Sequence, residues 1–198
     1  MTVVTIRAKL LDAAISLFGI WGYKGVTTRA IAREAGCMEA GLYRHFGNKK
    51  KLYSEAIANV AEDSAAKMRD FVVDHFGKRM ARETLIKAAI QCWYTSMSQS
   101  GAKLLLYVNL NDENHRQLAE GVFRKIVEVI LDALGEERAD KKRAKARAEA
   151  LLMQLLVARC KYPGDSGLKK VDVDEWLRIE EQVRHHDRRS RPAGLRVS

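Results

Sequence analysis

Residues 27–49, TTRAIAREAGCMEAGLYRHFGNK, decide the fold of this chain. The segment predicts two short helices joined by a tight turn, because Ala32, Gly36 and Leu42 stand four and then six residues apart. At that spacing a small residue lets the helices lie close together, a glycine takes the left-handed turn conformation, and an aliphatic side chain fills the shared core. The segment therefore predicts a helix-turn-helix.

The second helix of this pair is expected to turn a polar face outward. Leu42 and Phe46 supply its buried stripe, as Ile31 and Ala35 do for the first helix. The residues left outside are Met38, Glu39, Ala40, Gly41, Tyr43, Arg44 and His45. Such a face suits the major groove of DNA, where Glu39 is expected to read cytosine N4 and Arg44 to read guanine.

The flanking segments predict two further helices. Thr5 is expected to cap a first helix that runs to about Trp21 and ends at Gly22; its buried stripe would be Ile6, Leu10, Ala13, Ala14, Leu17 and Trp21. Thr27 or Thr28 would cap the next helix, whose free N–H groups can hold a DNA phosphate together with Arg29. Asn48 would cap a longer helix that begins with three lysines, 49–51, a cluster that a phosphate would compensate.

Composition favours an all-α protein. The 198 residues include only two prolines and many good helix formers, and no alternating run is long enough to predict a strand. No apolar run approaches the ~20 residues that cross a bilayer, and no signal peptide is evident. A soluble, cytoplasmic protein without a membrane partner is therefore expected.

The net charge of +10 is concentrated at the two ends of the chain. Residues 1–51 carry a balance of +6, residues 52–187 are neutral, and residues 188–198, which we expect to be disordered, carry +4. A basic N-terminal region on a neutral remainder indicates that this region meets a polyanion.

No pattern predicts an enzyme, a metal site or a cofactor. Cys37, Cys92 and Cys160 are odd in number and too far apart for a zinc site, which suits a reducing compartment. The five histidines lack metal-ligand spacing, and no Ser/His/Asp arrangement, glycine-rich phosphate loop or carboxylate pair stands out. We therefore expect no catalytic residue, no metal and no cofactor.

The C-terminal part predicts a helical bundle without a chemical motif. Residues 148–158 are apolar on nearly all sides, so that helix must be covered on more than one side. Residues that could line an internal ligand cavity are Trp93, Tyr94, Met97, Tyr107, Phe123 and Met153, although the same side chains are typical of an ordinary core. Such a cavity would suit a small, mostly apolar molecule.

Residues 5 to about 57 resemble the DNA-binding domain of the TetR (tetracycline-repressor-like) family of bacterial transcription regulators. The matching positions are Leu11-Asp12-Ala13-Ala14, Leu17-Phe18, Gly22-Tyr23, Thr27, Ile31-Ala32, Ala35-Gly36, Leu42-Tyr43, His45-Phe46 and Asn48-Lys49-Lys50-Lys51-Leu52. The resemblance implies a three-helix DNA-binding head, a helical C-terminal domain and a homodimer on a pseudo-palindromic operator. It also implies that phosphates are gripped by Thr27, Thr28, Tyr43, His45 and Lys49, while the first turns of the recognition helix read bases.

The resemblance further implies a dimer interface in which the last two long helices pair with their copies. Here the helices expected at 148–158 and 173–183 fit that role, with Ala148, Leu151, Leu152, Leu155, Trp176, Ile179 and Val183 in the interface. Two heads about one DNA turn (~34–36 Å) apart would gain the avidity that one head lacks.

The chain departs from the family pattern at three positions. Met38 stands where a serine or threonine cap is usual, which removes about 1 kcal/mol of helix stabilisation. Gly41 occupies a position where threonine or alanine is common, at a cost of up to ~1 kcal/mol. Cys37 replaces a common valine. These changes affect the base-reading residues rather than the fold.

We therefore divide the chain into a DNA-binding domain at 1–51, an effector-binding and dimerisation domain at 52–187, and a basic tail at 188–198. The expected protein is a ligand-responsive regulator, with repression favoured, that a small-molecule effector releases from a double-stranded DNA operator. The alternative is a helical protein-interaction module that keeps the fold without binding specific DNA. The salt dependence of DNA affinity separates the two.

Overall fold

The computed structural model describes residues 5–75, 81–133, 138–162, 164–175, 177 and 178, and within these ranges it contains helices and no strand. The elements are α1 (Ile6–Gly25), α2 (Thr28–Glu34), α3 (Glu39–Phe46), α4 (Lys49–His75), α5 (Arg82–Ser96), α6 (Gln99–Asn111), α7 (Glu113–Ala133), α8 (Arg138–Lys161) and a 3₁₀ helix, Gly164–Lys170. The prediction of an all-α chain is confirmed. The basic tail at 188–198 lies outside the described residues.

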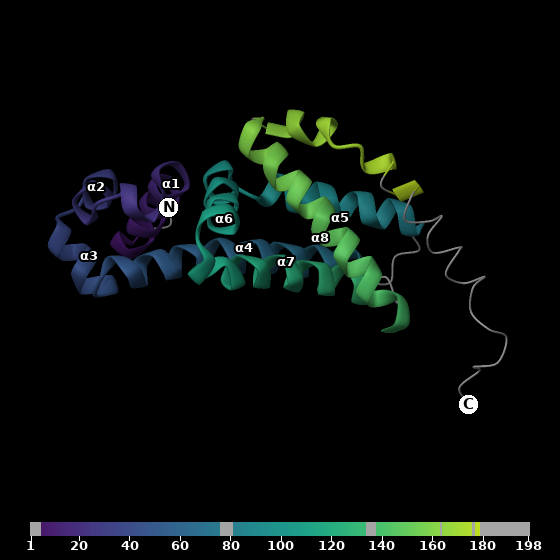
Figure 1. Cartoon of the computed structure of the whole chain (residues 1–198), viewed down its shortest axis with the longest axis horizontal. Helices are drawn as coiled ribbons and strands as arrows, with labels where there is room; N and C mark the ends of the chain where they lie inside the picture. Colours follow the sequence, from purple (N-terminus) through teal and green to yellow (C-terminus); the bar gives the residue numbers. More distant parts are fainter. Residues whose placement is uncertain (1–4, 76–80, 134–137, 163, 176, 179–198) are drawn as a thin grey trace.

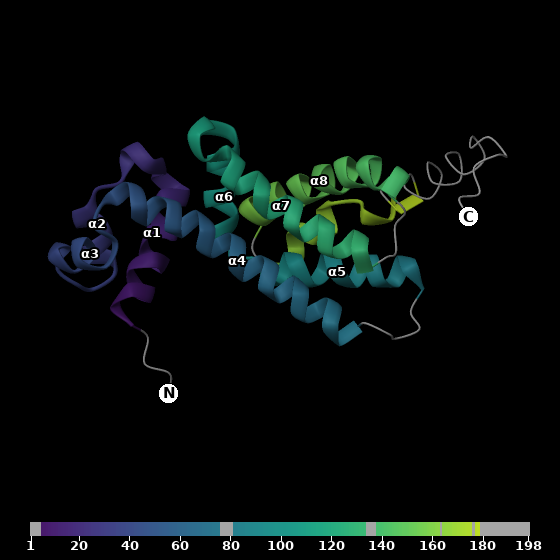
Figure 2. The same ribbon diagram turned by 90° about the horizontal axis from the view of Figure 1, so that it is seen from below.

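The molecule is elongated, with α1, α2 and α3 gathered at one end (Figure 1). The long helix α4 leaves this group and runs beside α7, while α5 and α8 cover the far half. Seen from below, α2 and α3 stand at the end opposite α5 (Figure 2). We call α1–α3 with the first turns of α4 the head, and the remaining helices the body. No described helix combines the length and apolar character that crossing a bilayer requires.

Short-range capping explains where the head helices begin. The Thr5 hydroxyl accepts a hydrogen bond from the Ala8 N–H at 3.2 Å, and the Thr27 hydroxyl accepts one from the Ala30 N–H at 3.1 Å. Asn48 Oδ1 accepts one from the Lys51 N–H at 2.8 Å. These bonds satisfy N–H groups that a helix start leaves without a partner. The three caps are confirmed, with Thr27 rather than Thr28 capping α2.

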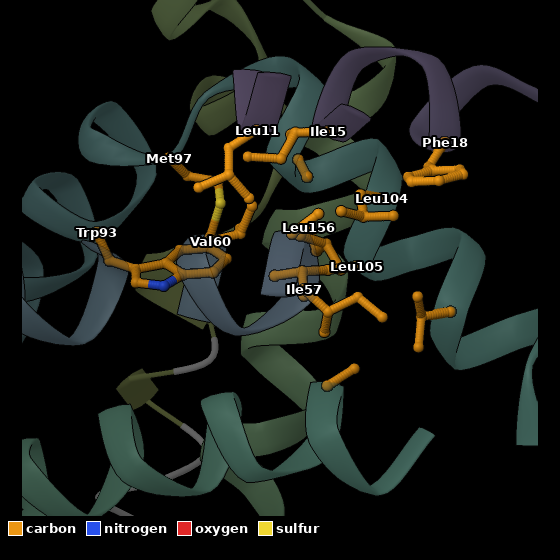
Figure 3. Packing of buried hydrophobic residues seen from close by; sticks show 14 of the residues in the cluster. Leu11, Ile15, Phe18, Ile57, Val60, Trp93, Met97, Leu104, Leu105 and Leu156 are labelled. Carbon is orange, nitrogen blue, oxygen red and sulfur yellow. The ribbon is translucent and has the colours of Figure 1, made fainter. Parts of the chain in front are cut away.

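One continuous apolar core joins the head to the body. Figure 3 shows Leu11, Ile15 and Phe18 of α1 in the same packed region as Leu104 and Leu105 of α6. The α1 helix lies so close to α6 that a Cβ added at Gly19 would stand 3.0 Å from the Leu104 backbone nitrogen. Burial of α1 is therefore shared between the head and the body. The division at residue 51 stays an interpretation.

The predicted buried stripe of α1 is wrong at both of its ends. Ile6 is 45% exposed and Trp21 is 65% exposed, whereas Leu11, Ile15 and Phe18 are buried. Helix α6 packs on a face of α1 that the sequence pattern left to solvent, and this packing buries Leu11, Ile15 and Phe18 instead. Directly after Trp21, Gly22 leaves the helical path at φ 67° and ψ 176°.

Candidate nucleic-acid interface

The turn between α2 and α3 has the geometry that its sequence predicts. Gly36 adopts φ +67°, a conformation that L side chains rarely take. The Gly36 N–H donates to the Arg33 carbonyl at 3.1 Å, and the Cys37 N–H donates to the Ala32 carbonyl at 2.9 Å. Ala32 and Leu42 are buried between the helices. The helix-turn-helix is confirmed.

The helix α3 presents an outer face at the far end of the head (Figure 2). Met38 is 82% exposed and Tyr43 is 48% exposed, and Ala40 and Arg44 are also exposed. Glu39, Gly41 and His45 are half-buried beside them. Leu42 and Phe46 face inward. Of the α3 residues predicted to contact DNA, Ala40, Tyr43 and Arg44 are thus the exposed ones, and Met38 before them makes no capping hydrogen bond to the N-terminus of α3.

A polar contact joins the N-terminus of α2 to this face. The Thr28 hydroxyl donates to Glu39 Oε1 at 2.5 Å and lies 3.4 Å from the Tyr43 hydroxyl. One carboxylate oxygen of Glu39 is thus engaged within the protein, and its second oxygen keeps its capacity to accept a hydrogen bond. Thr28 therefore fixes the orientation of two side chains that were predicted to meet DNA.

A groove of about 620 Å³ separates α2 from the start of α3. Arg29 and Arg33 line it from α2, and Met38 and Glu39 line it from the α3 side. Both arginines are exposed. The groove places two cations beside the outer face of α3, where a polyanion lying against that face would meet them.

Lys49 is the one lysine of the 49–51 cluster that is half-buried. Its Nζ lies 4.4 Å from the centre of the Tyr23 ring, within the range of a cation–π contact. Burial lowers the pKa of Lys49 from its ordinary value. Lys50 and Lys51 are exposed. The Tyr23 ring therefore holds the Lys49 side chain against the head.

Sequence reasoning missed a polar junction between the head and the body. His115, near the start of α7, places Nε2 3.2 Å from Ser54 Oγ of α4 and Nδ1 3.0 Å from Asp112 Oδ2. Its ring packs edge-on against Tyr53, with centroids 5.0 Å apart. Asp112 also caps α7, because its carboxylate accepts a hydrogen bond from the His115 N–H at 3.3 Å. No local signal reveals a partner 61 residues away.

Electrostatics favours the charged form of Asp112. Burial by itself would raise the pKa of this carboxyl group, but the hydrogen bond from His115 and the neighbouring Tyr53 hydroxyl outweigh burial, so the pKa lies below its ordinary value of 3.8. Burial, with the charge of Asp112 as a second cause, raises the pKa of Tyr53. Asp112 is therefore ionised and Tyr53 neutral at neutral pH.

The residues predicted to line a ligand cavity lie in different surroundings. Trp93, Tyr94 and Met97 are fully buried in the core of the body. Tyr107 instead packs against Gly22 of α1, where its ring leaves no room for a side chain. Met153 lines a small surface pocket of about 220 Å³ with Asn109, Glu120, Arg124 and Glu149. The Phe123 side chain lies outside the described residues.

The residues predicted for a dimer interface are also divided. Leu151, Leu152 and Leu155 of α8 are buried inside the single chain, and Ala148 is half-buried. Trp176, Ile179 and Val183 lie outside the described residues. Among its described side chains, α8 exposes Ala146, Ala150, Gln154, Val157 and Lys161. No described cluster of histidine, cysteine and carboxylate side chains could hold a metal ion.

These features define a class of protein: a helix-turn-helix head that shares a core with a helical body. Residues 10–56 match the family model of bacterial regulatory proteins of the tetR family. The match covers most of the head, from α1 to the first turns of α4.

Individual proteins show the same likeness. Over 101 residues the chain is 30% identical to the HTH-type transcriptional repressor KstR2 of Rhodococcus jostii (strain RHA1), an alignment covering 51% of this chain and 48% of that protein. The chain thus spans about half the length of this relative. A TetR transcriptional regulator from Legionella pneumophila superposes with a TM-score of 0.68 over 92% of this chain and 99% of that one, at 17% identity.

The ketosteroid transcriptional regulator KstR2 of Mycobacterium tuberculosis superposes with a TM-score of 0.61 over 90% of this chain and 94% of that one, at 17% identity. Likenesses at this level of identity show that the whole described chain, and not only its head, has the fold of TetR-type regulators.

Proposed function

We propose that this protein is a transcriptional repressor that binds a pseudo-palindromic operator as a homodimer and is released by a small molecule. The observation that carries the proposal is the outer face of α3, which stands at the far end of the head with Met38, Tyr43 and Arg44 exposed. A short helix with such a face enters the major groove of DNA in helix-turn-helix proteins.

Base reading is assigned to the first turns of α3 and to Arg44. Arginine binds guanine O6 and N7 through two hydrogen bonds, the commonest specific contact in the major groove. Glu39, oriented by Thr28, offers its second oxygen to a cytosine amino group. Ala40 and Gly41 leave room for the bases to approach the helix backbone. These contacts would give the protein its sequence preference.

Phosphate binding is assigned to the residues around this helix. Arg29 is exposed in the first turn of α2, Tyr43 and His45 flank α3, and Lys49 opens α4. Thr27 and Thr28 stand at the N-terminus of α2, where backbone N–H groups and the helix dipole favour an anion. Such contacts position a protein on DNA without reading sequence.

Dimerisation is assigned to the outer face of α8. Ala146, Ala150, Gln154 and Val157 recur at steps of four, four and three residues, so they lie on one side of the helix. None of the four carries a charge, and three are apolar; Lys161, four residues after Val157, adds a charge only at the end of the helix. The cores of protein interfaces are depleted of charge, and small side chains let two helices approach closely. The buried leucines of α8 support this face from within the chain.

Release is assigned to a small, mostly apolar effector that binds the body. The relative from Mycobacterium tuberculosis is described as a ketosteroid regulator, and a ligand of comparable apolar character suits a body whose core contains Trp93 and Met97. An effector that prefers a body conformation with mismatched head spacing weakens operator binding by linkage, and couplings of about 1–3 kcal/mol are typical.

The proposal is tested by titrating the full-length protein against the DNA upstream of its own coding region at several salt concentrations. A steep negative log–log slope, with protection of a short inverted repeat, is expected for a dimer that contacts several phosphates. A weak affinity that is equal for unrelated DNA would contradict the proposal and favour a protein-interaction module.

A further inference from the structure

We propose that His115 is a positioning residue for DNA binding: through Tyr53 and Tyr23 it holds the Lys49 side chain in place to contact a phosphate. This inference rests on the proposed function, because it assumes that Lys49 meets operator DNA. It adds His115, a residue of the body 66 positions after Lys49, to the residues that determine DNA affinity.

The corner between α6 and α7 fixes the position of His115 from the body side. Asp112 caps α7 through the His115 N–H at 3.3 Å and also binds His115 Nδ1 through its second oxygen at 3.0 Å. Arg116 Nε donates to the Asn109 carbonyl at 3.0 Å and ties α7 back to α6. The side chains of His115 and Asp112 are only 15% and 16% exposed. Contacts within the body therefore fix the position of the imidazole ring independently of its contacts with the head.

The same ring contacts two consecutive residues of α4. His115 Nε2 lies 3.2 Å from Ser54 Oγ, and the ring packs edge-on against Tyr53 at 5.0 Å. Tyr53 is fully buried. Because Ser54 and Tyr53 are adjacent on one turn, the two contacts fix both the rotation and the position of α4 at the point where the helix enters the head.

Aromatic packing continues from Tyr53 to Lys49. Tyr53 meets Tyr23 with ring centroids 4.9 Å apart and Phe18 at 4.8 Å, and Lys49 Nζ lies over the Tyr23 ring at 4.4 Å. Lys49 and Tyr53 are four residues apart on α4, so the Tyr23 ring fits against one face of that helix. His115 thus contacts Tyr53, and Tyr53 contacts Tyr23. Tyr23 in turn contacts Lys49.

A double-mutant cycle separates a positioning role from a general structural one. The variants are His115→Ala, Lys49→Gln and the double variant, each as the full chain on the operator defined by footprinting of the wild-type protein. Lys49→Gln is expected to weaken binding about tenfold at 0.15 M salt and to lower the salt slope by about one per protomer, since one phosphate contact is lost. His115→Ala is expected to reproduce part of both changes.

The decisive comparison is the effect of His115→Ala when Lys49 is already absent. We expect a loss of about three- to tenfold in the wild-type background and less than twofold in the Lys49→Gln background. His75→Ala is the matched control, because His75 is also half-buried and stacked on an aromatic ring, Phe71 at 4.1 Å, but at the opposite end of α4. It should leave the affinity and the salt slope unchanged.

A second variant guards against loss of folding. His115→Phe keeps a ring against Tyr53 but removes both side-chain hydrogen bonds, and it is expected to keep most of the affinity if ring packing transmits the effect. Equal losses on adding His115→Ala in the two backgrounds, or no loss in either, would overturn the inference. If the wild-type protein binds its operator tightly and specifically but Lys49→Gln leaves the salt slope unchanged, the inference about His115 is overturned and the proposed function stands. If the wild-type protein binds no operator, the inference and the proposed function are both overturned.

Discussion

Helices α3 and α8 both turn one face away from the rest of the chain, but the chemistry of the two faces differs. On α3 the exposed residues include Tyr43 and Arg44, with Met38 before its first turn. On α8 the described exposed side chains from Ala146 to Val157 are uncharged, and the charged Lys161 follows at the end of the helix. In a chain with 30% charged residues, four uncharged residues along one exposed side of a helix are unusual. The comparison shows that the side chains left exposed after the core is packed indicate which kind of partner a helix binds.

The largest expected effect comes from placing a charge on the outer face of α8. Val157→Glu should leave the protein monomeric and weaken operator binding more than 100-fold, because a desolvated carboxylate opposes packing and the avidity of two heads is lost. Sedimentation velocity and fluorescence anisotropy measure the two effects. Val73→Glu is the matched control, since Val73 is 73% exposed on α4. A Val157→Glu protein that is dimeric and binds the operator with normal affinity would show that the outer face of α8 does not form the dimer interface.

Next in size is the loss of a base contact on α3. Arg44→Ala should weaken operator binding by about 10- to 100-fold, which corresponds to the 1–3 kcal/mol of a bidentate contact, and should change binding to random DNA far less. Competition assays with operator and random duplexes measure the ratio. Arg69→Ala serves as the control, because Arg69 is exposed on α4 and pairs with Glu62 at 3.0 Å. Equal losses on both duplexes would mean that Arg44 binds phosphate rather than a base.

A smaller and different effect is expected from α2. Arg29→Gln should weaken binding to operator and random DNA by the same factor, and should lower the salt slope by about one per protomer, because a phosphate contact carries no sequence information. Titrations at four or more salt concentrations give the slope. A change in sequence preference instead would place Arg29 among the base-reading residues.

The smallest effect concerns the start of α3, which has no side-chain cap, in contrast to α2 with Thr27. Met38→Ser should raise the free energy of unfolding by about 1 kcal/mol, and Thr27→Ala should lower it by a similar amount. Urea unfolding monitored by circular dichroism measures both. No gain from Met38→Ser would mean that the serine hydroxyl does not reach the free N–H groups of α3.

The head could be predicted closely from sequence because its signals are local. Thr27, Gly36 and Asn48 act within three or four residues of themselves, through capping bonds and one left-handed turn. Such local signals do not depend on how the rest of the chain packs. The residues expected on the outer face of α3 lie there for the same reason.

The body and its junction with the head could not be predicted in this way, because distant contacts decide them. Trp21 is exposed although its spacing indicates burial, since α6 packs on a different face of α1. Leu151 and Leu155 fill the core of their own chain, a choice that the apolar pattern of α8 leaves open. His115 meets Ser54 across 61 residues, and nothing near either residue indicates the other.

Methylation of guanine N7 on the bound operator tests the central proposal most directly, because this atom lies in the major groove where α3 is placed. The wild-type protein is expected to protect guanines in two half-sites about one helical turn apart, and Arg44→Ala is expected to lose that protection at one guanine per half-site while other positions stay protected. Unprotected guanines throughout a tightly bound site would contradict the account.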